Sequence, residues 1–269
     1  METSDVKNMV KEKYGQIALQ SYTENAGSCC GTSGCGTVDY TVFSDDYSKL
    51  DGYNPDADLA LGCGIPTEFA QIREGHTVVD LGSGAGNDAF VARKLVGPNG
   101  KVIGIDMTEA MIEKAKINNS KLGYTNIDFR LGDIENMPVE DNSTDVVISN
   151  CVLNLVPDKV KAFLEIYRIL KPGAHFSISD VVLEGTLPPA IESAAVMYAG
   201  CISGALQKKD YMEIIRRTGF KDAAIQKEKQ IRVPDSILQE YLNEAELAEF
   251  KKSGAAIISV TVYGKKPAL

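Results

Sequence analysis

Six cysteines give this 269-residue chain its most distinctive side-chain chemistry. Thiolates are nucleophiles and ligands for soft metal and metalloid ions. Four of the cysteines lie in two segments that are too rich in glycine for the interior of a helix or strand. Residues 28–36 contain three cysteines, the last of them Cys35, and residues 61–64 contain Cys63. At any single position, the alternative to a chemical role is a structural one, in which the cysteine is buried as a small apolar side chain.

A second chemical feature is the glycine-rich segment Asp80-Leu-Gly82-Ser-Gly84-Ala-Gly86, which follows an expected strand and precedes an expected helix. Glycines there permit a tight turn and let a ligand approach the backbone. A dinucleotide-binding loop has its third glycine one position later, where this chain has Asn87. The observed spacing instead suits the carboxypropyl and ribose portion of S-adenosylmethionine, which has no pyrophosphate. We therefore favour S-adenosylmethionine over NAD as the cofactor.

Polar side chains at the ends of the next strands extend this predicted site. Asp106 ends the second expected strand, where an acid can accept both ribose hydroxyls. Residues 132–134 follow the third strand and could bind the adenine amino group. A helix-packing role for Gly86 and a helix-capping role for Asp106 are the alternatives. The residues assigned to the cofactor are Asp80, Gly82, Gly84, Gly86, Asp106, Met107, Asp133, Ile134 and Asn150.

Short apolar runs alternate with amphipathic stretches from about residue 76 onward. The expected strands are residues 78–81, 102–106, 127–131, 146–149, 175–179, 223–233 and 257–263. The expected helices are residues 5–22, one beginning at Pro66, one capped by Thr108, one from Asp158 to residues 171–173, and much of 184–219. Buried strands that alternate with helices are typical of βαβ units and a parallel sheet.

The order of these elements predicts an α/β fold, the class I (Rossmann-like) methyltransferase fold. Its sheet is doubly wound, mostly parallel and seven-stranded, and the last strand is expected to run antiparallel. We divide the chain into an N-terminal helix and Cys/Gly-rich lid over residues 1–66, a cofactor-binding core over 67–183, and a C-terminal substrate segment over 184–269 that completes the sheet.

Composition narrows the class of partner. The formal net charge is -9 and the isoelectric point is near 4.9, so the chain lacks the basic surface that nucleic acid requires. No apolar run approaches the roughly 20 residues that span a bilayer. The acidic, polar first five residues are unlike a secretory or transit peptide. We expect a cytoplasmic protein, in which cysteines stay reduced.

The residue at the end of the fourth expected strand indicates what kind of atom accepts the methyl group. Ligands of such sheets lie beyond the carboxyl ends of the strands, and here that position is occupied by Cys151. Cys201 lies between two glycines in the segment expected to fold over the site. Both histidines, His76 and His175, flank strand starts, which leaves no evident general base. These features favour a soft acceptor with its own lone pair, such as trivalent arsenic bound by three thiolates.

At these residues the chain resembles the arsenite S-adenosylmethionine methyltransferases, over nearly its whole length. The matching segments are Val10-Lys-Glu-Lys-Tyr14-Gly15, Leu61-Gly62-Cys63-Gly64, Asp80-Leu-Gly-Ser-Gly-Ala-Gly86, Gly104-Ile-Asp106-Met107-Thr108, Gly132-Asp-Ile-Glu135, Ser149-Asn-Cys151-Val-Leu-Asn-Leu155, Lys171-Pro-Gly173, Ile178-Ser-Asp180-Val and Tyr198-Ala-Gly-Cys201-Ile-Ser-Gly204. The segments around Cys151 and Cys201 are specific to that family, whereas many methyltransferases share the cofactor motifs.

The resemblance implies an arsenic-detoxifying enzyme with four functional cysteines. Cys151 and Cys201 match the pair that holds arsenite directly, and Cys63 matches a third cysteine, available to complete a three-coordinate arsenic site or to form a disulfide. Cys35 matches the fourth, N-terminal cysteine, with Cys29 and Cys30 close by. Arsenite is expected to arrive as a thiol conjugate. A disulfide between Cys35 and Cys63 could keep arsenic trivalent, with thioredoxin or glutathione as the reductant.

Two other functions remain open at this point. A carbon methyltransferase of the quinone or sterol type shares the cofactor motifs, but would need an acid or histidine at the substrate mouth and would tolerate loss of the cysteines. A non-enzymatic protein could bind zinc through Cys29, Cys30 and Cys35. The Cys-x4-Cys spacing with no second cluster is not typical of structural zinc sites.

Overall fold

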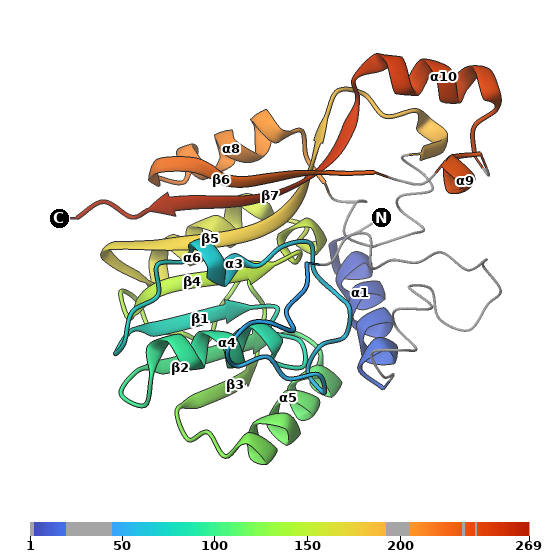
Figure 1. Ribbon diagram of the computed structural model, residues 1–269. Helices are drawn as coiled ribbons and strands as arrows, with labels where there is room; N and C mark the ends of the chain where they lie inside the picture. Colours follow the sequence, from blue (N-terminus) through green and yellow to red (C-terminus); the bar gives the residue numbers. More distant parts are fainter. Residues whose placement is uncertain (1–2, 20–44, 192–204, 233–234, 240, 269) are drawn as a thin grey trace.

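The architecture is a seven-stranded sheet covered by helices on both faces. The computed structural model describes residues 3–19, 45–191, 205–232, 235–239 and 241–268 (Figure 1). The strand order is β3-β2-β1-β4-β5-β7-β6, and β7 runs antiparallel to both of its neighbours. The strands are β1 (Thr77–Leu81), β2 (Lys101–Asp106), β3 (Ile127–Leu131), β4 (Thr144–Asn150), β5 (Leu170–Glu184), β6 (Lys221–Ile231) and β7 (Ala256–Lys265). The predicted fold class is confirmed.

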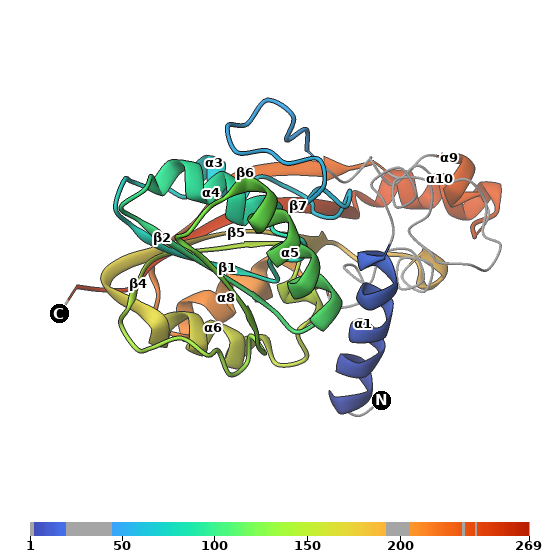
Figure 2. The same cartoon turned by 90° about the horizontal axis from the view of Figure 1, so that it is seen from below.

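Alternate residues of the central strands pack against opposite helix layers. Val79 and Leu81 belong to one apolar cluster with α6 (Lys159–Ile169) and α8 (Lys208–Arg217). Val78 packs instead with α1 (Thr3–Ala18), α4 (Asn87–Val96) and α5 (Glu109–Leu122). Figure 2 shows α4 and α5 on one side of the sheet and α6 and α8 on the other. Because both faces are covered, the strands read as continuous apolar runs.

A third apolar cluster lies beyond the carboxyl end of β4. It combines the last residues of β5 with α9 (Asp235–Leu238), α10 (Glu244–Ser253) and two cysteines, Cys63 and Cys151. Helix α10 is well delimited, because Asn243 and Glu246 form a reciprocal capping box at its start and Gly254 ends it in a left-handed conformation. The C-terminal segment therefore builds an apolar cover next to two of the thiols that could do chemistry.

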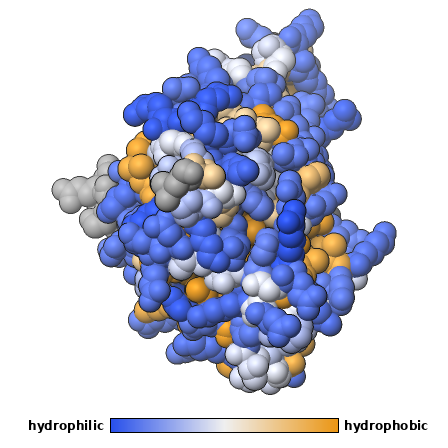
Figure 3. Space-filling view, turned by 90° about the vertical axis from the view of Figure 1, so that its left-hand side faces the viewer, coloured by the Kyte–Doolittle hydropathy of each residue, from blue (hydrophilic) through white to orange (hydrophobic). Residues whose placement is uncertain are grey.

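Two surface features complete the description. No helix among the described residues is long and apolar enough to cross a membrane. The face on the left-hand side of Figure 1 is mainly hydrophilic, with its apolar residues in small scattered groups (Figure 3).

Several predicted elements differ from the structure in their ends. The helix after Asp158 ends at Ile169, and residues 171–173 already belong to β5, because Leu170 pairs with Thr144 of β4. The Thr108 side chain does not cap α5; its hydroxyl is hydrogen-bonded to Asp106 instead. Of residues 205–219, only 208–217 form a helix, and β5 continues to Glu184. Helix α3 (Pro66–Phe69) does begin at Pro66 but has four residues.

One buried acid inside β5 gives the fold a testable pH response. Asp180 is fully buried and accepts hydrogen bonds from the Tyr211 hydroxyl at 3.1 Å and the Val181 N–H at 3.0 Å. Burial raises the pKa of its carboxyl to about 7. Between the unfolded pKa near 4 and this value, the folded state binds more protons than the unfolded state. Stability therefore falls as pH rises through that interval, by about 1.4 kcal/mol per unit of pKa difference.

We expect Asp180→Asn to gain stability relative to the parent protein as pH rises from 4 toward 7, because asparagine does not titrate. Thermal unfolding of both proteins at pH 5 and pH 8 measures this. A difference in Tm that stays constant across that range would contradict the raised pKa.

Candidate active site

A large pocket opens at the carboxyl ends of β1 to β4, where parallel α/β sheets bind their ligands. Its empty volume is about 1140 Å³, including space open to solvent. Helix α1 contributes Lys7, Val10 and Tyr14 to the lining. Every residue assigned to the cofactor lines the pocket except Gly86. The lining members of that set are Asp80, Gly82, Gly84, Asp106, Met107, Asp133, Ile134 and Asn150.

The glycine loop between β1 and α4 is shaped by close contacts. Gly82 has φ +64°, and a Cβ there would lie 2.4 Å from a methyl group of Val152. Gly84 faces open space, with the nearest heavy atom 4.0 Å from such a Cβ. Gly86 is the N-cap of α4, where a Cβ would lie 2.9 Å from the rings of Phe90 and Phe129. This geometry supports the helix-packing alternative for Gly86.

Asp106 lies at the end of β2 with both carboxylate oxygens directed at backbone amides. Oδ2 accepts the Gly84 N–H at 3.0 Å and Oδ1 accepts the Thr108 N–H at 2.8 Å. Burial raises the pKa of this carboxyl, although these hydrogen bonds oppose the shift. The Thr108 hydroxyl and the Met107 N–H also bind this carboxylate, which lines the pocket. Asp106 also binds the backbone of Thr108, the N-cap of α5. This contact is consistent with the helix-capping role that the sequence left open for Asp106.

Asp80 lines the pocket, and one of its carboxyl oxygens is unsatisfied among the described residues. Its Oδ2 is buried and finds no hydrogen-bond partner among the described residues. Burial raises its pKa well above the usual range, and the charges of Asp88 and Asp106 add to the shift. A buried carboxylate of this kind calls for a cationic donor. S-adenosylmethionine carries an ammonium and a sulfonium, so the residues present fit this cofactor.

Asp133 has partners that the sequence did not indicate. Its Oδ2 lies 2.6 Å from Nζ of Lys7 in α1, and its Oδ1 accepts the Glu135 N–H at 2.9 Å. Lys7 also pairs with the buried Glu135. The carboxylate of Asp133 is thus engaged by α1, and the backbone of residues 132–134 is what remains to meet an adenine. No local pattern could reveal a contact between residues 126 positions apart.

The two described thiols lie together in the third apolar cluster. Cys63 is 1% exposed and Cys151 is 7% exposed. Cys151 lines the pocket directly after β4, and its φ of +60° is rare outside glycine. Such strained backbone is concentrated at functional sites. Cys35 and Cys201 lie outside the described residues, as do Cys29 and Cys30. Of the four predicted thiols, the structure therefore brings Cys63 and Cys151 into one cluster.

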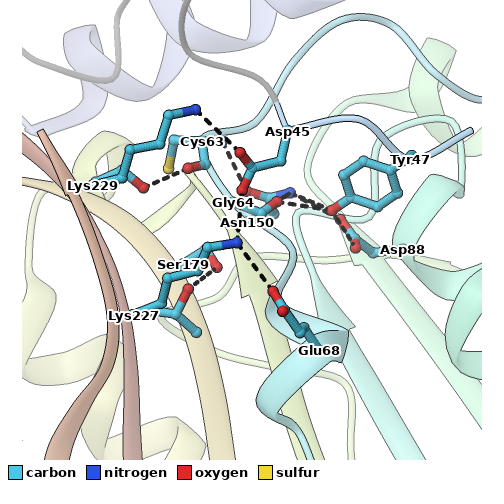
Figure 4. A network of polar contacts seen from close by, with 12 residues as sticks. Asp45, Tyr47, Cys63, Gly64, Glu68, Asp88, Asn150, Ser179, Lys227 and Lys229 are labelled. Atoms are coloured by element: carbon cyan, nitrogen blue, oxygen red, sulfur yellow. Dashed lines mark hydrogen bonds and ion pairs between the residues drawn. The ribbon is translucent and has the colours of Figure 1, made fainter. Parts of the chain in front are cut away.

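A network of buried and partly buried hydrogen bonds links the Cys63 loop to the end of β4 (Figure 4). Asn150 is at its centre: Oδ1 accepts the Cys63 N–H at 3.1 Å, and Nδ2 lies 2.9 Å from the Gly64 carbonyl. Tyr47 and Asp88 surround the same amide and were not singled out from the sequence. Burial raises the pKa of Asp88 to about 6, so its carboxyl is mainly ionised at neutral pH.

Neither histidine is among the described residues that line the pocket. His175 Nε2 lies 2.7 Å from the Ala70 carbonyl, and His76 Nδ1 accepts the Arg73 N–H at 3.2 Å. His76 directly precedes β1, as predicted, whereas His175 lies within β5, opposite Val146, because that strand begins at Leu170.

The sheet order, the glycine loop and the acid at the end of β2 define an S-adenosylmethionine-dependent methyltransferase of class I. A family model described as "Methyltransferase domain" matches residues 72–219. The chain belongs to the arsenite methyltransferase family, as its relatives show.

An arsenite methyltransferase of Halobacterium salinarum is 37% identical over 99% of this chain and 68% of its own length. An arsenite methyltransferase of Aquipseudomonas alcaligenes is 33% identical over 88% of this chain and 68% of its own length. The crystal structure of an arsenic(III) S-adenosylmethionine methyltransferase from Chlamydomonas reinhardtii matches with a TM-score of 0.64 and 38% identity, over 75% of this chain and 66% of that one. The chain thus spans about two thirds of the length of these relatives.

Replacing Asp106 tests the cofactor site. We expect Asp106→Ala to weaken binding of S-adenosylmethionine by roughly 10- to 100-fold, since hydrogen bonds to a charged group contribute about 1.5–3 kcal/mol. Calorimetric titration measures the affinity, and thermal unfolding checks that the variant is folded. An unchanged affinity would remove Asp106 from the site.

Gly86 should respond differently. We expect Gly86→Ala to lower the free energy of unfolding by roughly 1–3 kcal/mol through overpacking and left-handed strain. Urea denaturation measures the loss. If stability were unchanged while cofactor affinity fell, Gly86 would belong to the binding surface after all.

Proposed function

We propose that this chain transfers the methyl group of S-adenosylmethionine to trivalent arsenic held by its thiols. One observation carries the proposal: Cys151 lines the cofactor pocket at the end of β4 and lies in the same apolar cluster as Cys63. Soft thiolates at that point present a metalloid, rather than a carbon or nitrogen atom, to the cofactor.

When bound, S-adenosylmethionine supplies a methyl group activated by its sulfonium. Asp106 would accept the ribose hydroxyls of the cofactor, and Asp80 would face its ammonium. These two acids line the polar side of the pocket, and Cys151 both lines the pocket and belongs to the apolar cluster. The chain thereby separates a polar cofactor subsite from a dry acceptor subsite.

Arsenic reaches the protein thiols by exchange. In each exchange a new bond forms between cysteine sulfur and arsenic, one bond between arsenic and the carrier thiol breaks, and the cysteine proton passes to the released thiol. Cys63 and Cys151 supply two ligands, and we assign the third to Cys201. Three sulfur ligands leave the arsenic lone pair free to attack the methyl carbon.

Such an acceptor needs no general base, in keeping with the positions of both histidines away from the pocket. The protein must mainly hold two reactants in line and exclude water. Alignment of bound reactants can supply roughly 7–11 kcal/mol of a barrier.

Methylation oxidises arsenic from the trivalent to the pentavalent state. We propose that the Cys35 thiol attacks the sulfur of arsenic-bound Cys63. A disulfide forms, the bond between Cys63 sulfur and arsenic breaks with its electron pair returning to arsenic, and one proton leaves Cys35. Thioredoxin or glutathione then reduces that disulfide. This cycle requires a reducing compartment, so we place the reaction in the cytoplasm.

Cys151→Ser tests the function. We expect loss of arsenite methylation by at least 100-fold, because a hydroxyl does not bind trivalent arsenic as a thiolate does, with cofactor affinity kept within about threefold of the parent. Incubation with arsenite, glutathione and S-adenosylmethionine, followed by separation of arsenic species, measures turnover. Full turnover by this variant would refute the ligand role of Cys151.

A further inference from the structure

Three segments far apart in the sequence meet around the side chain of Asn150. They are the chain before α3, the first turn of α4, and the end of β4 (Figure 4). Nδ2 of Asn150 lies 2.9 Å from Oη of Tyr47, 2.9 Å from the Gly64 carbonyl and 3.2 Å from Oδ2 of Asp88. The Tyr47 hydroxyl is 2.8 Å from Oδ1 of Asp88 and 3.0 Å from the Gly64 carbonyl.

The donors and acceptors of this network define a direction. An ionised carboxylate only accepts, so Asp88 takes the proton of Tyr47 on one oxygen and an amide proton of Asn150 on the other. The Nδ2 end of Asn150 must therefore face Asp88, which leaves Oδ1 to accept the Cys63 N–H at 3.1 Å. The Gly64 carbonyl, which only accepts, and the Cys63 N–H, which only donates, require the same orientation, so Tyr47 and Asp88 reinforce it from the other side of the amide.

The orientation of that amide bears directly on both described thiols. Cys63 is held on its amide side by Asn150 and on its carbonyl side by the Ser259 hydroxyl of β7. Asn150 is also the residue before Cys151, whose N–H binds the Ser179 carbonyl at 2.7 Å. One side chain thus ties the backbone of one thiol to the strand that carries the other.

The close approach is possible because glycines flank Cys63. A Cβ at Gly62 would lie 2.8 Å from Nδ2 of Asn150, and one at Gly64 would lie 2.6 Å from Oγ of Ser179. Asp88 lies in the first turn of α4, two residues after Gly86, so the same network reaches the glycine loop of the cofactor pocket. Asp88 and Asn150 both line that pocket.

We propose that Tyr47 and Asp88 are positioning residues for methyl transfer: they orient Asn150 and, through it, set Cys63 relative to Cys151 and the cofactor loop. This inference rests on the proposed function. Neither side chain touches arsenic or the methyl group, and their effect on the reaction passes through the Cys63 backbone.

Tyr47→Phe removes the hydroxyl and keeps the ring. We expect kcat/KM for arsenite to fall about tenfold or more, while calorimetry with S-adenosylhomocysteine shows a change in Kd below threefold. Tyr211→Phe is the matched control, because Tyr211 is also fully buried and donates its hydroxyl to a buried aspartate, Asp180. It should lose a similar amount of thermal stability and keep its kcat/KM.

A double-variant cycle separates positioning from general stability. If Tyr47 acts through Cys63, Tyr47→Phe should weaken arsenite binding in the parent protein, measured by calorimetric titration with arsenite and glutathione, but should add nothing in a Cys63→Ser background. Equal losses in both backgrounds would overturn the proposal. Should Tyr47→Phe be unfolded at the assay temperature, Asp88→Asn takes its place in the same cycle, because an amide has one oxygen and cannot accept on both sides, from Tyr47 and from Asn150.

Assays of the parent protein separate a failure of the proposed function from a failure of the positioning role. A parent that binds the cofactor but forms no methylated arsenic refutes the proposed function. A parent that methylates arsenite, together with a folded Tyr47→Phe variant of unchanged kcat/KM, refutes only the positioning role.

Discussion

The register of β4 between β1 and β5 is the constraint on which both halves of the site depend. Ser149 pairs with Leu81 on one side and with Ile178 on the other, and its hydroxyl donates to the Leu81 carbonyl at 3.2 Å. The glycine loop starts directly after Leu81, so Asn150 and Cys151 must leave the sheet beside it. Because a slip of one residue would exchange the faces of β4, buried packing on both sides fixes this juxtaposition.

Much of this arrangement was predictable from local patterns. The strand at residues 127–131 has its expected ends, and Asp158 caps α6 by accepting the Lys161 N–H. Periodicity and turn residues report such features because their causes lie within a few residues. The extension of β5 back to Leu170 escaped prediction, because its cause is pairing with Thr144 on another strand. Tertiary pairing there overrides the breaking tendency of residues 171–173.

The unpredicted parts of the site share a different cause. Asn150 meets Tyr47 and Asp88 across 103 and 62 positions, and Lys7 meets Asp133 across 126. Tyrosine, aspartate and lysine are ordinary residues at those places, and nothing in their neighbours marks them. Only the fold brings these side chains together, where their buried polar atoms need one another as hydrogen-bond partners. Cys63 was found from the sequence because cysteine between glycines is chemically unusual, and Cys151 because it directly follows the fourth expected strand.

The contacts that position Cys63 differ in strength, which indicates what sets its location. Asp45 lies near the start of the chain that leads to Cys63 and α3. Its carboxylate pairs with Lys227 at 3.3 Å and Lys229 at 3.1 Å on β6, in partly exposed positions (Figure 4). Exposed ion pairs contribute only about 0–1 kcal/mol each. The carbonyls of Cys63 and Gly64 instead accept buried hydrogen bonds from the hydroxyls of Ser259 and Tyr47, and an unmet buried group costs about 1–3 kcal/mol. The buried network, rather than the ion pairs, therefore determines where the thiol stands.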